Sequence, residues 1–210
     1  LRITRKTSEK LFDFSFRLAQ QRAAQKGRKG RVTCVDKANV FRSFSWFRSI
    51  FEERAKAFPA IQADAAYVDA FAMWMVQNPW EYDVVVTENM FGDILSDLGA
   101  GIIGSLGLAP SADIGDENAV FQPCHGTAPD IMGKGLANPM AMFMSAAMML
   151  DWLAVTQEDD RMKQAADLLN AAIDQGISSG VGLTKDLGGD CGTKGCLAAV
   201  LSNIENQKTR

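Results

Sequence analysis

The spacing of apolar residues changes several times along the chain, which predicts alternating helices and strands. Apolar side chains recur every three or four residues from Ser8 to Gln25 and from Phe44 to Ala57, as in helices. The runs RVTCVD, IQADAAYV and YDVVVTEN are short, apolar and bounded by turn residues, so each is predicted to be a strand. A further helix is expected from about Asp69 to Gln77. Helices that alternate with strands favour an α/β sheet.

Turn residues mark the boundaries of these elements. The first helix is expected to follow an N-cap at Thr7 and to end at the turn KGRKG, and the second is expected to end near Pro59. A glycine-rich passage at residues 99–118 is too long and too interrupted for one regular element, so it is the predicted crossing between two domains. An irregular loop, FQPCHGTAPDIMGKGLANP, follows it. Three more helices are predicted at about residues 140–153, 158–175 and 195–205.

The composition is that of an ordinary globular protein, with 47% apolar and 22% charged residues among 210. The longest apolar run, AMFMSAAMML, is shorter than the roughly 18 to 20 residues that span a bilayer. No leader-like pattern opens the chain. We therefore expect a cytoplasmic protein that has no membrane partner.

Charge and cysteine usage argue against two other classes of protein. Residues 1–31 carry ten basic and two acidic side chains, which we interpret as a solvated helix face and a turn, with no nucleic acid as partner. The four cysteines lack C-x-x-C spacing, and His125 is the only histidine. Neither a zinc site nor a disulfide framework is therefore expected.

Two aspartates lie four residues apart in the stretch NMFGDILSD. On a helix, Asp93 and Asp97 would be neighbours on one face and would repel each other unless a cation lay between them. An isolated pair of this kind is more often a solvated face. Asp69, at a junction between strand and helix in YVDAFAM, is the best candidate for a third carboxylate. Three carboxylates are hard oxygen donors, which suit Mg²⁺ or Mn²⁺.

Six motifs of the chain carry a resemblance to a known family: VDKANV, YVDAFAM, NMFGDILSD, GSLGLAPSA, HGTAPDIMGKGLANP and DLGG. In this order they resemble the β-decarboxylating dehydrogenases, which include 3-isopropylmalate and isocitrate dehydrogenases, over essentially the whole chain. The resemblance implies an α/β, isopropylmalate dehydrogenase-like fold of two domains with a central mixed sheet, its N-terminal part missing. Residues 1–103 would be part of a dimerisation and substrate domain. Residues 104–210 would be the C-terminal part of a cofactor-binding domain.

The resemblance also implies a metal-dependent reaction at the aspartates. The Mg²⁺ or Mn²⁺ ion would be held by three of them: Asp69, Asp93 and Asp97. Lys37 would transfer a proton to and from the substrate's hydroxyl beside Asp69, and the substrate itself, a 2-hydroxy acid, would contact Lys37, Asn39 and Val40. The protein is expected to be a homodimer in which Lys37, Asn39 and Asp69 reach across to the site of the partner.

The cofactor is expected to be NAD. No G-x-G-x-x-G fingerprint is present, and the resemblance assigns the adenosine half to the irregular loop instead. The residues that would wrap it are His125, Gly126, Thr127, Ala128 and Pro129. Asn138 would meet the adenine, and Asp130 would accept hydrogen bonds from the ribose hydroxyls. Because a carboxylate repels a 2′-phosphate, Asp130 followed by Ile131 favours NAD over NADP.

Three features depart from the family pattern. Gln122 stands where a glutamate is usual, and Phe41 and Arg42 follow KANV where an aliphatic residue is common. The arginine cluster that grips substrate carboxylates and the catalytic tyrosine would lie upstream of Leu1. The chain therefore resembles the C-terminal three-fifths of an enzyme, and on its own it is expected to be inactive.

Several functions stay open at this point. The motif VDKANV favours 3-isopropylmalate, a substrate of leucine biosynthesis, with Val40 near its side chain. D-malate, tartrate, homoisocitrate and isocitrate are alternative substrates. An alternative of another class is a truncated, non-catalytic paralogue that acts as a dimerising subunit.

Overall fold

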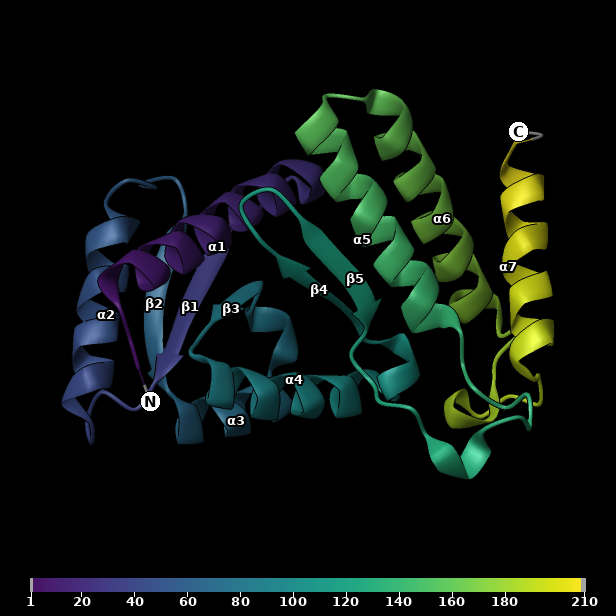
Figure 1. The fold of residues 1–210 in the computed structure, drawn as a ribbon, viewed down its shortest axis with the longest axis horizontal. Helices are drawn as coiled ribbons and strands as arrows, with labels where there is room; N and C mark the ends of the chain where they lie inside the picture. The colour runs from purple at the N-terminus through teal and green to yellow at the C-terminus, as the bar shows by residue number, and fades with distance from the viewer. Residues whose placement is uncertain (1, 209–210) are drawn as a thin grey trace. The chain divides into compact units, whose positions relative to one another are not determined.

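The computed structural model describes residues 2–208, shown in Figure 1. They form two compact units, which divide between Gly99 and Ala100. The division falls inside helix α4 (Asn89–Ile103), and the predicted domain boundary, between residues 103 and 104, lies at the end of the same helix.

The first unit alternates helices with strands. Its elements are α1 (Arg5–Lys26), β1 (Arg31–Asp36), α2 (Arg42–Ala55), β2 (Gln62–Tyr67), α3 (Val68–Gln77), η1 (Pro79–Glu81), β3 (Val84–Val86) and most of α4. The three strands run parallel in the order β2-β1-β3, so β1 is the middle strand and β2 lies at an edge. This arrangement confirms the α/β fold that the alternating pattern predicts.

Two predicted boundaries are wrong, and side-chain hydrogen bonds explain both. Helix α1 begins one turn early because the hydroxyl of Thr4, not Thr7, is the cap: it accepts the backbone N–H of Thr7 at 3.4 Å. The predicted strand YDVVVTEN is paired only over β3. The strand is short because Asp83, just before it, accepts a hydrogen bond from Arg22, and Glu88, just after it, caps α4.

The alternation of side chains along β1 divides the first unit into three layers. Val32 and Cys34 are fully buried against α1 and α2, in a cluster that includes Phe12 and Phe51. Val35 points to the opposite face, where a second buried cluster joins it to residues of β2, α3 and α4. Because successive side chains of a strand point to opposite faces, the same alternation determines the face on which the first residues after β1 lie.

The second unit combines a strand hairpin with helices. Its elements after α4 are η2 (Leu106–Leu108), β4 (Pro110–Ile114), β5 (Ala119–Pro123), η3 (Pro129–Ile131), α5 (Met140–Gln157), α6 (Asp160–Ser179), η4 (Lys185–Leu187) and α7 (Thr193–Lys208). Strand β4 and the turn of the antiparallel hairpin lie within the glycine-rich passage at residues 99–118, and β5 follows directly after it. The tight turn of the hairpin, closed by the backbone N–H of Gly115 on the carbonyl of Asn118 at 2.9 Å, explains the glycine there.

Helix α5 is apolar on all sides. By length and composition alone it could cross a membrane, because its mean hydropathy is 1.2 over 18 residues. Its longest uninterrupted apolar run is shorter than that. It packs along α6 and against β5, and it starts at a buried methionine, Met140. Since apolar helices of this kind also occur in the cores of globular proteins, we interpret α5 as a packing helix of this unit.

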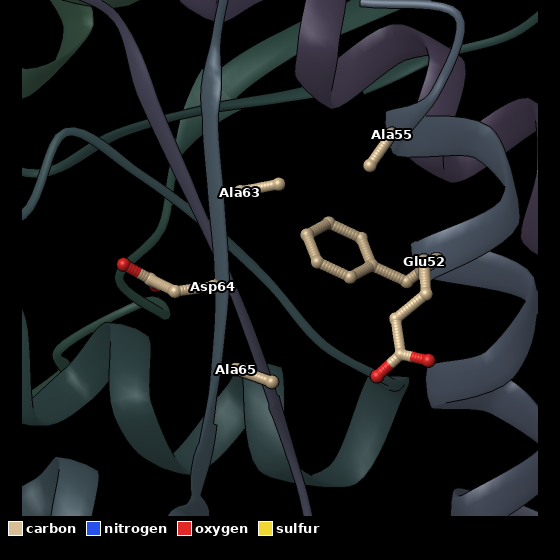
Figure 2. Close-up of a pocket in the computed structure, with 6 residues that line it drawn as sticks. Glu52, Ala55, Ala63, Asp64 and Ala65 are labelled. Atoms are coloured by element: carbon tan, nitrogen blue, oxygen red, sulfur yellow. The ribbon is translucent and has the colours of Figure 1, made fainter. Parts of the chain in front are cut away.

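A cavity of about 270 Å³ lies between α2 and the edge strand β2. Figure 2 shows Ala63 and Ala65 turned toward Ala55 and Glu52 of α2, with Asp64 on the other side of the strand. The small alanine side chains account for the space. The cavity's lining contains none of the residues that the sequence analysis assigns to catalysis or binding, so the site is built elsewhere.

Candidate functional site

The predicted catalytic residues follow the carboxyl ends of the parallel strands. Lys37 and the turn after it come from the end of β1, and Asp69 lies in the first turn of α3, directly after β2. Asp93 and Asp97 lie on α4, which begins shortly after β3. In open α/β sheets ligands bind outside the carboxyl ends of the strands, so this edge is the candidate active site.

Lys37 and Asp69 contact each other at this edge. Asp36 and Tyr67 are paired neighbours across β1 and β2, so the next residues of both strands emerge side by side. The ammonium group of Lys37 donates to Oδ1 of Asp69, whose side chain is 67% exposed. This hydrogen bond is the main reason that the pKa of Asp69 is lowered, and backbone N–H groups add to the shift. The pair presents an amine and a carboxylate together to solvent.

The turn after β1 is held by a buried carboxylate. Asp36 has no solvent exposure, and its Oδ1 accepts the backbone N–H of Ala38 at 2.8 Å. The carbonyl of Lys37 accepts the backbone N–H of Val40 at 3.0 Å, which closes the turn. Asn39 and Val40 are exposed at the surface of this turn, where a substrate could reach them.

Helix α4 presents the two aspartates of the stretch NMFGDILSD on one exposed face. The carboxylate of Glu88 caps the helix by accepting the backbone N–H groups of Met90 at 3.2 Å and Phe91 at 3.0 Å. Asp93 and Asp97 are both exposed, and within the described part of the chain no hydrogen bond or ion pair reaches either carboxylate. Four free oxygens on one helix face are a suitable set of donors for a hard divalent cation.

The third predicted ligand does not join this pair within one chain. Among residues 2–208, no three acidic, histidine or cysteine side chains lie close enough together to hold a metal ion. Asp69 instead faces Lys37. Within one chain, the two predicted ligands on α4 therefore lie apart from the third, on α3.

The predicted adenosine-binding residues lie in an exposed loop of the second unit. His125, Thr127 and Asp130 are all exposed, and Nδ1 of His125 lies 3.0 Å from the carbonyl oxygen of Gly126. Ala128 has a φ of 43°, in the left-handed region that a residue with a side chain seldom adopts. This conformation directs the chain into η3, which begins at the next residue.

Asn138 ends this loop and is nearly buried, with 9% exposure. Its Nδ2 donates to Oδ2 of Asp186 at 3.0 Å, and its Oδ1 accepts the backbone N–H of Met140 at 3.0 Å. The same oxygen of Asp186 accepts the hydroxyl of Ser105. Burial alone would raise the pKa of Asp186, but hydrogen bonds, including those from Ser105 and Asn138, outweigh it and lower this pKa. The amide of Asn138 is thus engaged inside the protein by one hydrogen bond at each end.

Three supporting residues were not identified from the sequence. Asp36 and Asp186 lie inside motifs that the resemblance includes, VDKANV and DLGG, yet the motifs give no sign that these carboxylates are bound internally. Glu88 lies just before α4, and because glutamate is not among the residues that usually mark an N-cap, no local signal identifies it as the cap.

Comparison with known proteins identifies the family. The sequence model described as isocitrate/isopropylmalate dehydrogenase matches residues 1–200. The 3-isopropylmalate/3-methylmalate dehydrogenase of Methanocaldococcus jannaschii is 45% identical over 91% of this chain and 55% of its own length. The homoisocitrate dehydrogenase of the same organism is 43% identical over 98% of this chain and 55% of its own.

A solved structure agrees with these relatives. The crystal structure of isocitrate dehydrogenase from Methylococcus capsulatus is 42% identical and superposes with a TM-score of 0.85, covering 97% of this chain and 57% of its own. The chain thus spans a little over half the length of the relatives it matches. Since family match, sequence identity and fold agree, the chain belongs to the isocitrate/isopropylmalate dehydrogenase family.

Proposed function

We propose that this chain serves the NAD- and metal-dependent oxidative decarboxylation of a 2-hydroxy dicarboxylic acid, with 3-isopropylmalate as the favoured substrate. The observation that carries the proposal is the contact between Lys37 and Asp69 at the carboxyl ends of β1 and β2. An amine held at this edge can exchange a proton with a hydroxyl group placed above it.

Each residue then has a defined task. Lys37, as the neutral amine, would take the proton of the substrate's 2-hydroxyl, and NAD, when bound, would accept hydride from the same carbon. Asp69 holds the amine in place and, with Asp93 and Asp97, would bind the cation. A divalent cation supplies Lewis acidity, which eases deprotonation of the hydroxyl and stabilises negative charge as carbon dioxide is lost. Asp130 accepts hydrogen bonds from the ribose, which disfavours NADP.

A homodimer would complete the ligand set. The oxygens of Asp93 and Asp97 are free, whereas Asp69 faces Lys37 of its own chain, so a second copy would bring its Asp69 to this pair. Apolar side chains exposed on α3 and α4 support this assembly. They include Met73, Val76, Ile94 and Ile103. Burying such side chains between two copies would provide the hydrophobic contact that stable dimers use.

The choice of substrate is the finer part of the proposal. The relatives include enzymes named for 3-isopropylmalate, homoisocitrate and isocitrate, at similar identity. We favour 3-isopropylmalate because Val40 is an exposed aliphatic side chain three residues after Lys37. An apolar contact there suits an isopropyl group better than a carboxylate.

The test is a panel of substrates assayed with the full polypeptide that the gene encodes. We expect kcat/KM to be highest for 3-isopropylmalate with NAD and Mn²⁺ or Mg²⁺, and to vanish with a chelator. A higher value for another 2-hydroxy acid would reassign the substrate. A dimer that binds neither NAD nor any member of the panel would favour a non-catalytic subunit.

A further inference from the structure

We infer that Asp36 and Arg48 are positioning residues that set the geometry of the Lys37–Asp69 pair; the inference rests on the proposed function of that pair. Asp36 is fully buried at the end of β1. Nε and Nη2 of Arg48, from α2, each lie 2.7 Å from a different oxygen of the Asp36 carboxylate. Such a bidentate ion pair fixes the orientation of the carboxylate as well as its distance from the guanidinium group.

The ion pair reaches both strands that carry the site. The guanidinium carbon of Arg48 lies 4.9 Å from the ring centre of Tyr67, the residue of β2 that pairs with Asp36. Arg48 therefore ties the last residue of β1 to the last residue of β2. Lys37 is the next residue of the first strand, and Asp69 follows Tyr67 after one intervening residue.

The alternation of side chains along β1 explains why the Asp36–Arg48 pair lies on the opposite face of the sheet from the Lys37 side chain. Asp36 continues the row of Val32 and Cys34, which faces α2, whereas Lys37 points to the opposite face, toward α3. One oxygen of Asp36 also accepts the backbone N–H of Ala38 at 2.8 Å, so the carboxylate holds the backbone on both sides of Lys37. The backbone of Lys37 is thereby restrained while its amine stays free to act.

A second ion pair of α2 provides a matched control. Arg54 binds Asp13 of α1 through two hydrogen bonds of 2.8 and 3.0 Å. The Arg54–Asp13 pair is also bidentate and its arginine lies on the same helix, but this pair joins α2 to α1 and not to the strand ends. If the Asp36–Arg48 pair only stabilised the fold, substitutions in the two pairs would have the same kind of effect.

The first test is a crosslink that needs neither substrate nor turnover. A water-soluble carbodiimide joins an amine to a carboxylate in contact as an amide, and takes up the water that is lost. Mass spectrometry of the full polypeptide should detect the Lys37–Asp69 crosslink. We expect Arg48→Met to lower its yield at least about fivefold, and Arg54→Met to leave it unchanged. The crosslink of Lys163 to Asp167, another close pair, serves as internal reference.

A second variant guards against simple unfolding. Arg48→Met leaves a buried, unpaired carboxylate, which can strongly destabilise a protein. Asp36→Asn combined with Arg48→Met removes both charges and should fold, yet it should lose the crosslink to the same extent. An undiminished crosslink in the folded double variant would overturn the inference, whatever the substrate of the protein proves to be.

The kinetic test separates positioning from stability. In the double variant kcat should fall by about 10- to 100-fold per folded site, because displacement of a catalytic group by about 1 Å can have an effect of that size. The Kd of NAD should stay within twofold. Arg48→Lys keeps the positive charge but cannot form the bidentate contact, so it should recover part of kcat. Equal kcat values for the double variant and Arg54→Met would show that the pair acts on the fold alone.

Discussion

The two units hold their predicted site residues in different ways. In the first unit, Lys37 and Asp69 follow neighbouring parallel strands, so backbone pairing brings them together. In the second unit, the loop that would bind adenosine is held outside any sheet: Asn138 donates to Asp186, the hydroxyl of Thr193 donates to the carbonyl of Ala137 at 2.5 Å, and the backbone N–H of Thr193 donates to the carbonyl of Gly135 at 2.8 Å. The proposed catalytic pair is thus placed by strand pairing, whereas the proposed cofactor loop depends on a few hydrogen bonds, so substitutions should affect the two differently.

The largest effect is expected at the helix of the first unit. Asp93→Asn removes a negative charge from the proposed cation site and should lower Mg²⁺ or Mn²⁺ affinity more than about 100-fold, since even residues behind the ligands contribute 10- to 100-fold. Turnover should fall with it. The measurement is kcat as a function of metal concentration, with Asp174→Asn, another exposed helical aspartate, as control. If the face were only solvated, the substitution would relieve repulsion from Asp97 and spare activity.

The next effect is expected in the loop of the second unit. Asp130→Lys together with Ile131→Tyr removes an acceptor for the ribose hydroxyls and adds a partner for a 2′-phosphate. Each change is worth about 1 to 3 kcal/mol, as for hydrogen bonds to charged groups. The ratio of kcat/KM for NAD to that for NADP should therefore fall by at least tenfold, with kcat for the preferred cofactor retained. A ratio equal to that of the parent protein would place the ribose elsewhere.

A smaller effect should follow when the support of the loop is weakened. Asp186→Asn keeps the shape of the side chain but weakens its hydrogen bonds from Ser105 and Asn138. We expect the Kd of NAD, measured by fluorescence titration, to rise by about tenfold, or 1.4 kcal/mol. At saturating NAD, kcat should be unchanged, because the proposed catalytic pair follows the strand ends of the other unit. A loss of kcat at saturation would contradict this separation.

The smallest effect on activity is expected at the amino end of β3. The Asp83 side chain is 5% exposed and accepts hydrogen bonds from Arg22 at 2.8 Å and Arg28 at 3.1 Å. Burial alone would raise its pKa, but the two arginines lower it below the usual value. Asp83→Asn should reduce the free energy of unfolding by about 1 kcal/mol and leave kcat unchanged.

The pH dependence of that stability has a definite sign. Because the pKa of Asp83 is lower in the folded than in the unfolded protein, its stabilising effect is complete above the ordinary aspartate value, about 3.9, and is lost as the pH falls below it. Chemical denaturation at neutral pH and below pH 3 provides the measurement. The difference between parent and variant should shrink at the lower pH, and a constant difference would assign the effect to something other than the charge.

The sequence predicts the strands of the first unit well because their signal is local. β1 matches the run RVTCVD residue for residue, because its apolar residues Val32, Cys34 and Val35 and the turn residues that flank it mark a buried strand. The β4–β5 hairpin is not predicted because β4 begins with proline, contains aspartate and is followed by glycine, and β5 ends in proline, and all of these residues are typical of loops. What makes it a hairpin is pairing across the turn and packing against α5, and neither is encoded in spacing.

The contacts that support the site could not be predicted for a related reason. Asn138 and Asp186 lie 48 positions apart, and no periodicity links them. Asp36 follows an apolar run, and an acid there normally marks the solvated end of a strand. It is buried because Arg48 comes from a different element to neutralise it. Sequence motifs identify the predicted site residues, whereas the residues that support them are brought close only by the tertiary structure.

The alternation of side chains along β1 has a consequence for how this protein can evolve. Inserting or deleting one residue between Val32 and Asp36 would reverse the faces, turning Lys37 toward α2 and its buried neighbour toward α3. A change of length in this segment would therefore be more disruptive than a conservative substitution. Residues 124–137 have no such register, so we expect this loop to tolerate changes of length as well as of composition.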